Sequence, residues 1–192
     1  MIKKVMLSAL FLPAMLSVKA QVFQENMGIV TANVSISDHY AAKGFGNSAT
    51  LKFSGSAEVQ SNGSSNLKYK TASGDASGGA NVRIGNVIGS DLVISGINTT
   101  KINSPVLGFG ILKNTMGSTG SELAVEYSVD GGKNWVALLF PPLATGEGTS
   151  LTWSYRETGT LPKSDKLMLR FKQTSTAHVF RIDDISVFDK VQ

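Results

Sequence analysis

The residues with the clearest potential for chemistry are two adjacent carboxylates, Asp183 and Asp184, inside an apolar, β-branched run at 180–187. Asp is disfavoured in strands, and an ionised carboxylate is costly to bury without a partner. An acidic pair between Ile182 and Ile185 therefore predicts a nearby arginine, a cluster of backbone amides or a cation. We expect the cation.

Few residues could support catalysis. The two histidines, His39 and His178, have no hydrolase motif around them, and the chain has no Cys. Asp38 and His39 are adjacent, and neighbouring side chains on a strand point to opposite faces, so we expect no direct cooperation between them. A glycosidase with paired carboxylates stays open, although most acids lie in predicted turns. We predict that the protein is not an enzyme, with a small hydrolase as an alternative.

Four aromatic residues are candidates for binding a sugar, because sugar C–H faces stack on flat rings. They are Tyr40, Tyr69, Trp153 and Tyr155. Trp153 and Tyr155 are two residues apart and would share one face of a strand. They form either a stacking platform or part of the core opposite Phe140, and the core is favoured. Tyr69 follows a polar loop and is expected to be exposed.

The segment 128–135, Ser-Val-Asp-Gly-Gly-Lys-Asn-Trp, resembles the Asp-box hairpin of sialidases and other secreted β proteins, with Asn134 where Thr is usual. It is a folding motif, since Asp130 can accept backbone amides across the turn and Trp135 can pack beneath the hairpin. In sialidases the box recurs and is not catalytic, whereas this chain has one copy. The motif predicts a hairpin and no sialidase activity.

The elements that must position these residues are β-strands. Short apolar or alternating runs are separated by Gly, Ser, Asn and Thr clusters, with no convincing amphipathic helix, which is typical of an all-β protein. We predict strands near residues 49–53, 80–84, 91–94, 105–112, 122–128, 135–140, 150–156, 166–173 and 178–188. Strands with one buried face and long polar connections predict a two-sheet antiparallel β-sandwich.

The first twenty residues have the three parts of a secretory signal peptide: Lys3 and Lys4, an apolar stretch at 5–16, and Val-Lys-Ala before Gln21. We expect residues 21–192 to form one secreted domain (periplasmic, cell-surface or extracellular) without a membrane-spanning segment. Because the chain has no Cys, its core must hold the domain, with or without a metal. Loss of the signal peptide lowers the formal net charge from +4 to about +1. The sequence has no cluster of Lys and Arg of the kind that binds nucleic acid, so we expect no nucleic-acid partner.

The start of the mature chain, Phe-Gln-Glu-Asn-Met-Gly at 23–28, and the late Ile-Asp at 182–183 resemble calcium-carrying carbohydrate-binding jelly rolls and MAM-like domains. There, the first and last strands lie side by side and share a structural Ca²⁺, which prefers about six to eight oxygens. The resemblance implies five ligands, the first two being the best: Glu25, Asp183, Asn26, Asp38 and Asp184. The alternative is an ion pair in which Arg181 or Lys43 neutralises an acid.

A wider resemblance covers nearly all of the mature chain. The segments 46–53, 76–82, 94–99, 123–131 and 180–185 look like a jelly-roll accessory module of secreted bacterial surface proteins. The resemblance implies a noncatalytic module that binds a glycan or acts in adhesion, with a structural calcium site. The alternative is a protein-interaction or surface-assembly subunit of the cell envelope, whose partner is a cell-surface protein.

Overall fold

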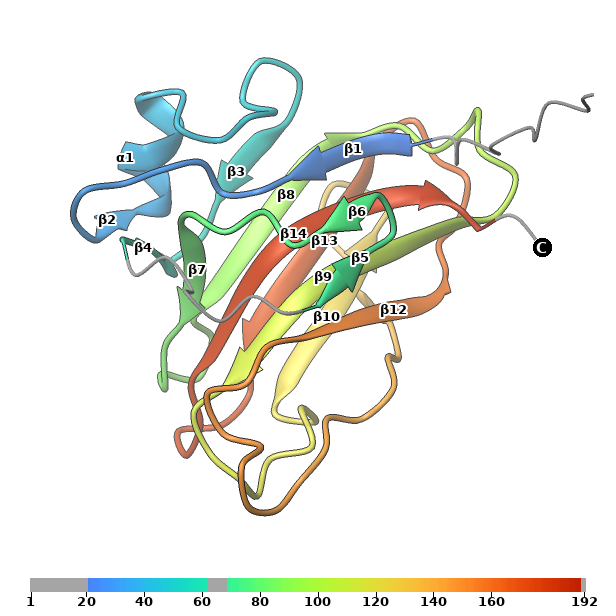
Figure 1. The fold of residues 1–192 in the computed structure, drawn as a ribbon. Helices are drawn as coiled ribbons and strands as arrows, with labels where there is room; N and C mark the ends of the chain where they lie inside the picture. Colours follow the sequence, from blue (N-terminus) through green and yellow to red (C-terminus); the bar gives the residue numbers. More distant parts are fainter. Residues whose placement is uncertain (1–20, 62–68, 191–192) are drawn as a thin grey trace, which may run out of the picture.

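The computed structural model describes residues 21–61 and 69–190, and the predicted signal peptide at 1–20 lies outside them. Within the described residues, a seven-stranded and a five-stranded antiparallel sheet form two layers around a shared core (Figure 1). The prediction of an all-β, two-sheet antiparallel jelly roll is confirmed.

The strands of the seven-stranded sheet follow the order β12-β9-β14-β7-β4-β2, with β1 paired to β14. Their bounds are β1 (Gln21–Glu25), β2 (Val34–Ser35), β4 (Glu58–Gln60), β7 (Asn81–Ile84), β9 (Pro105–Lys113), β12 (Ser154–Thr160) and β14 (Phe180–Asp189). The first and last strands of the mature chain therefore lie side by side, as the resemblance implied.

The five-stranded sheet follows the order β11-β10-β13-β8-β3. Its strands are β3 (Lys52–Ser54), β8 (Asp91–Ile97), β10 (Leu123–Ser128), β11 (Val136–Ala137) and β13 (Leu167–Gln173). A separate hairpin consists of β5 (Lys70–Thr71) and β6 (Gly74–Asp75), and it crosses in front of β9 and β14 (Figure 1).

The sequence alternation explains which faces are buried. In β13, Leu167, Leu169 and Phe171 are fully buried while the residues between them are half-buried, as expected of a strand with one face on the core. By contrast, every residue of β9 is buried, because this strand lies between β12 and β14 and both of its faces are covered.

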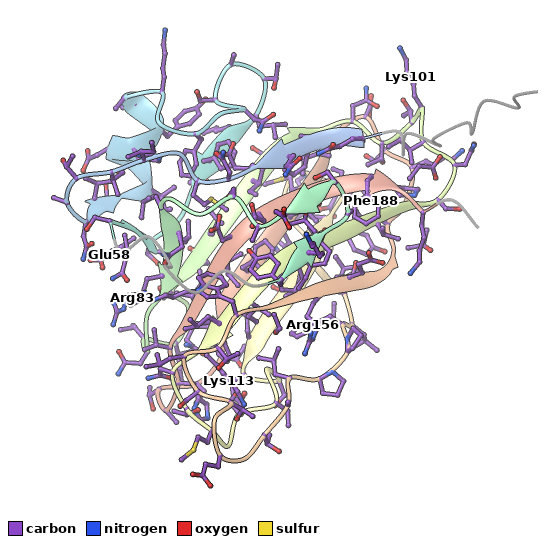
Figure 2. The ribbon with its side chains drawn as sticks, in the orientation of Figure 1. Glu58, Arg83, Lys101, Lys113, Arg156 and Phe188 are labelled. Atoms are coloured by element: carbon purple, nitrogen blue, oxygen red, sulfur yellow. The ribbon has the colours of Figure 1, made fainter. Side chains whose placement is uncertain are left out.

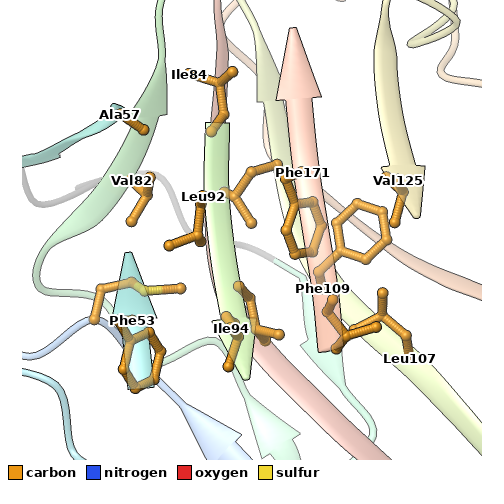
Figure 3. Packing of buried hydrophobic residues seen from close by; sticks show 14 of the residues in the cluster. Phe53, Ala57, Val82, Ile84, Leu92, Ile94, Leu107, Phe109, Val125 and Phe171 are labelled. Carbon is orange, nitrogen blue, oxygen red and sulfur yellow. The ribbon is translucent and has the colours of Figure 1, made fainter. Parts of the chain in front are cut away.

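The main core lies between the two sheets (Figure 3). Phe109 of β9 meets Phe171 of β13 edge to face, with ring centroids 5.1 Å apart, and it meets Phe140 edge to face at 5.4 Å. Such edge-to-face pairs add to the free energy gained by burying the rings. The contact between Phe109 and Phe171 joins the two sheets.

Several elements differ from the sequence prediction; the strand predicted at 150–156, for example, is β12 at Ser154–Thr160. The helix α1 (Ile36–Ala41) was not predicted; its N-cap residue is Ser35, whose hydroxyl accepts the N–H of Asp38. Asp38 and His39 therefore lie on a helix, not on a strand. The predicted strand at 135–140 is reduced to the two residues of β11, and two prolines follow at 141–142. Among the described residues, no helix is long and apolar enough to cross a membrane.

Candidate functional site

A β-bulge in β14 positions the acidic pair. The register of β14 against β9 shifts between Asp183, opposite Gly110, and Ser186, opposite Gly108. Within this shift Asp184 has a φ of +47°, a left-handed conformation that Asp tolerates better than most residues. Asp183 is fully buried and Asp184 is 1% exposed. The bulge interrupts the strand alternation, so two adjacent acids can both be covered.

Asp184 of β14 accepts hydrogen bonds from the residues that flank the β5–β6 hairpin. The Tyr69 hydroxyl donates a 2.5 Å hydrogen bond to Asp184 Oδ2, and the Ser77 N–H donates to the same carboxylate at 3.2 Å. Burial and then the hydrogen bond to Asp184 raise the pKa of Tyr69 above its ordinary value. The phenol therefore stays protonated and remains a donor to Asp184.

Three of the four predicted ligand-binding aromatics meet on one surface. They lie on the outer face of the seven-stranded sheet, the face turned away from the five-stranded sheet. We define the outer-face cluster as Tyr69, Leu112, Trp153 and Tyr155. The Tyr69 ring lies 6.2 Å from the Trp153 ring and 6.1 Å from the Tyr155 ring, and the Tyr155 hydroxyl is 3.1 Å from Ser186 Oγ.

Two glycines of β9 make room for these rings. A Cβ at Gly110 would lie 2.1 Å from the Tyr69 hydroxyl, and one at Gly108 would lie 2.0 Å from the Tyr155 hydroxyl. Any larger residue would therefore push the phenols off the sheet. The glycines at 108 and 110 are two apart, so they open one face of β9 while Phe109 between them points into the core.

The structure corrects the expected exposure of these aromatics. Tyr69 was expected to be exposed but is only 8% exposed, because it lies over β9. Trp153 is buried and Tyr155 half-buried, yet both belong to the outer-face cluster and not to the core beside Phe140. Tyr40 is separate from the cluster, since it packs against Phe53 in the main core.

Glu25, at the end of β1, is buried in a ring of hydrogen-bond donors. Its Oε1 accepts the backbone N–H groups of Met27 at 3.0 Å and Gly46 at 3.1 Å. Its Oε2 accepts both the backbone N–H and the side-chain amide of Asn47 at 3.0 Å. A carboxylate has about four lone-pair positions. These four hydrogen bonds occupy them, so the amide cluster stabilises Glu25 without a cation.

Asp183 is the acid without full compensation. Its Oδ1 accepts the N–H of Asp184 at 2.7 Å, but its Oδ2 is buried with no hydrogen-bond partner. Burial, followed by the nearby charges of Asp184 and Glu25, raises the pKa of Asp183 to about 9. Among the described residues, neither Arg181 nor Lys43 forms an ion pair with Asp183, Asp184 or Glu25. Asp183 is therefore neutral at pH 7 in this arrangement.

The residues as arranged do not fit the predicted calcium site. Glu25 has no free lone pair, Asp183 Oδ2 has no hydrogen bond, and Asp184 accepts hydrogen bonds from Tyr69 and Ser77. These acids offer fewer open oxygens than the six or so that Ca²⁺ needs. Asn26 is exposed and accepts the Gly28 N–H, and exposed Asp38 accepts the Ser35 hydroxyl. The described residues contain no group of three His, Cys, Asp or Glu that could hold a metal. Calcium binding stays a prediction.

The two histidines lie in different surroundings. His39 is buried, with Nε2 3.0 Å from the Met27 carbonyl and its ring edge to face with Phe45. His178 lies between the Thr115 hydroxyl, 2.9 Å from Nδ1, and Glu122, 3.4 Å from Nε2. The order hydroxyl, imidazole and carboxylate was not visible in the sequence, because the three residues come from two separate loops.

The Asp-box segment forms the predicted hairpin turn. Asp130 accepts the backbone N–H of Asn134 at 3.0 Å and its side-chain amide at 2.7 Å, and these bonds lower the pKa of Asp130. The Gly132 N–H donates to Ser128 Oγ at 3.0 Å. The Arg170 guanidinium lies 4.0 Å from the centre of the half-buried Trp135 ring. The turn is held by its own side chains and offers no open catalytic group.

Comparisons with known proteins bear on the fold. No protein-family model matches the sequence, and the search of curated proteins finds no match. The K1 cleaved adhesin domain of Lys-gingipain from Porphyromonas gingivalis W83 is a similar solved structure, with a TM-score of 0.50 and 17% identity over 74% of this chain and 92% of that domain. This likeness shows the fold alone, a jelly-roll β-sandwich.

Two further solved structures have lower TM-scores. The K3 cleaved adhesin domain of Lys-gingipain from the same bacterium scores 0.49, with 15% identity over 89% of this chain and all of that domain. The CBM22-1 xylan-binding domain of Paenibacillus barcinonensis Xyn10C scores 0.43, with 13% identity over 92% of this chain and all of that domain.

Proposed function

We propose that this protein is a noncatalytic binding module that recognises a glycan in an adhesive role. The observation that carries the proposal is the outer-face cluster, in which Tyr69, Trp153 and Tyr155 gather beside polar groups on one sheet face. The likeness in fold to an adhesin domain supports the adhesive role.

The chemistry of this face suits a sugar better than an apolar ligand. Tyr155 is half-buried, so part of its ring is accessible, and its hydroxyl pairs with Ser186. Rings that offer a face together with fixed hydroxyl and carboxylate groups match the alternating C–H and O–H surfaces of a sugar. The ligand would therefore contact Tyr155 first, along the β12 side of the cluster.

A glycan array probed with residues 21–192 tests the proposal, with Tyr155→Ala as the site variant. Tyr127→Ala is the matched control, because Tyr127 is also half-buried but belongs to β10 in the other sheet. We expect array binding to fall at least about tenfold for Tyr155→Ala and to persist for the control. A blank array, or equal loss in both variants, would refute glycan recognition at this face.

A second candidate function, binding to a cell-surface protein, rests on a different surface. A groove of about 380 Å³ runs beside β10 and β11, and Leu139 at its rim is 84% exposed. Exposed apolar residues beside a groove are typical of protein contacts. Binding of the labelled protein to envelope fragments separates the two functions. If the ligand is a glycan, treating the fragments with periodate abolishes binding. If the partner is a protein, treating the fragments with protease abolishes binding, and the Leu139→Asp variant does not bind untreated fragments.

We also propose that residues 1–20 direct export, so that the module acts outside the cytoplasm. The proposal rests on the charged, apolar and small-residue parts of that segment. N-terminal sequencing of the protein recovered from outside the cytoplasm is expected to begin at Gln21. A product that retains Met1, or that stays in the cytoplasm, would contradict it.

A further inference from the structure

Two arginines lie directly opposite each other on the outer face. Arg181 of β14 pairs with Arg83 of β7 in the antiparallel register, and Arg83 in turn is opposite Glu58 of β4. On the other side Arg181 is opposite Leu112, a member of the outer-face cluster. The arginines therefore continue the surface assigned to ligand binding, and Figure 2 shows Arg83 near Glu58.

Neither guanidinium is well neutralised. The Arg83 Nη1 to Glu58 Oε2 distance is 3.7 Å, and the Glu58 side chain is 52% exposed, so this ion pair is weak. Arg181 forms no hydrogen bond or ion pair with any described residue, although it is half-buried. Burial and the charge of Arg83 lower the pKa of Arg181, which is the expected sign for an uncompensated cation.

The pair is unfavourable for folding but well suited to an anion. Like charges directly opposite each other on neighbouring strands are destabilising. Guanidinium groups, however, bind carboxylate and sulfate through paired N–H donors, and two of them on adjacent strands can bracket a single oxyanion. A hollow of about 260 Å³ borders Arg83 on its β4 side, but Glu58 lines it and Arg181 does not. An oxyanion held by both arginines would therefore lie between the two guanidinium groups and not in this hollow.

We propose that Arg181 and Arg83 form an anion-binding site for the carboxylate or sulfate group of an acidic glycan. This inference rests on the proposed glycan-binding function and narrows its ligand class. The cross-strand pair of arginines offers donors for one charged group, and the rest of the glycan would extend past Leu112 toward Tyr155.

Calorimetric titration of residues 21–192 with an oligogalacturonate and with its methyl ester tests this site. The ester is the same sugar chain without charge, and a sulfated galactan oligomer distinguishes sulfate from carboxylate. The site variants are Arg181→Gln and Arg83→Gln. Lys52→Gln is the matched control. Lys52 is exposed on the five-stranded sheet, so this substitution removes one positive charge far from the proposed site.

We expect the acidic oligomers to bind at least about tenfold more tightly than the ester at about 0.1 M salt. Each arginine variant should lose about tenfold in affinity for them, and the control should keep its affinity. Melting temperatures of the arginine variants should equal or exceed that of the parent, because the repulsion is relieved. Loss of binding is then not a loss of folding.

Three results would overturn the site. Equal binding of acid and ester would leave glycan recognition intact but remove the anion site. Equal weakening by Lys52→Gln would show that only net charge matters. Absence of binding to every glycan, charged or neutral, would remove the proposed function as well as this site.

Discussion

Replacing Asp183 with Asn tests how the buried acidic pair is neutralised. The pKa of Asp183 is about 9 in the folded protein against an ordinary value of 3.8. At pH 7 the unfolded chain therefore carries an ionised Asp183 that must take up a proton on folding. About three pH units at 1.36 kcal/mol per unit correspond to a cost of about 4 kcal/mol.

Asp183→Asn removes this cost and keeps an oxygen to accept the Asp184 N–H. Its new amide N–H₂ replaces the buried oxygen that lacks a partner, and an unmet donor costs about 1–2 kcal/mol. We therefore expect the variant to be more stable than the parent by about 2 kcal/mol at pH 7.

The pH dependence provides the sharper signature. An acid whose folded pKa is raised contributes stability that is fully present below its unfolded pKa of 3.8 and is lost as the pH rises through its folded pKa of about 9. The stability of the variant relative to the parent should therefore increase by about 1.4 kcal/mol per pH unit between these values and be constant outside them.

Urea unfolding of the parent and of Asp183→Asn at about pH 5, 7 and 9, in EDTA and then in Ca²⁺, measures this difference. Asp165→Asn, at an exposed position, is the control and should show no such slope. The reasoning is refuted if the variant is less stable at every pH. If the parent is in addition stabilised by Ca²⁺ and the variant is not, Asp183 is an ionised calcium ligand, as the sequence predicted.

Two further substitutions test a buried ammonium in the loops beyond β9 and the packing beneath the outer-face cluster. Lys113→Met should lower the free energy of unfolding, measured in urea, by about 3 kcal/mol. The buried Lys113 ammonium (Figure 2) donates to three loop carbonyl groups, which the variant leaves without a donor. Lys101→Met, at an exposed position, is the control, and an equal effect of both substitutions would contradict the argument. Gly110→Ala should cost about 2 kcal/mol and increase Tyr69 exposure in fluorescence quenching, whereas Gly159→Ala, which meets open space, should do neither.

The sequence was sufficient for most of the long strands, because their alternation records which face is buried, although β12 begins four residues later than predicted. In β13 every second residue is apolar, and the predicted strand at 166–173 matches Leu167–Gln173. The two- and three-residue strands β2, β4, β5 and β6 have no room for a periodic pattern, and their existence depends on a partner strand. Likewise, the six residues of α1 are too few for a helical repeat to stand out.

The site was predictable in its residues but not in its arrangement. The acidic pair identified β14 as unusual, yet the bulge that covers both acids requires the register of two strands. Tyr69 lies 115 residues from Asp184 in the sequence, so no local pattern could connect them. The glycines at 108 and 110 were a usable signal, since two small residues on one face of a buried strand indicate that something packs closely there.

The outer face carries an acid, Asp183, and a base, Arg181, and neither has an ion-pair partner among the described residues. They are two residues apart on β14, about 7 Å along the strand, and they form no ion pair. Asp183 turns to the Asp184 N–H and becomes neutral by keeping its proton, so it cannot balance Arg181. The charges of the two guanidinium groups are then not balanced by this acid. An anionic group of a ligand would balance the positive charge of these arginines, which the protonated Asp183 does not.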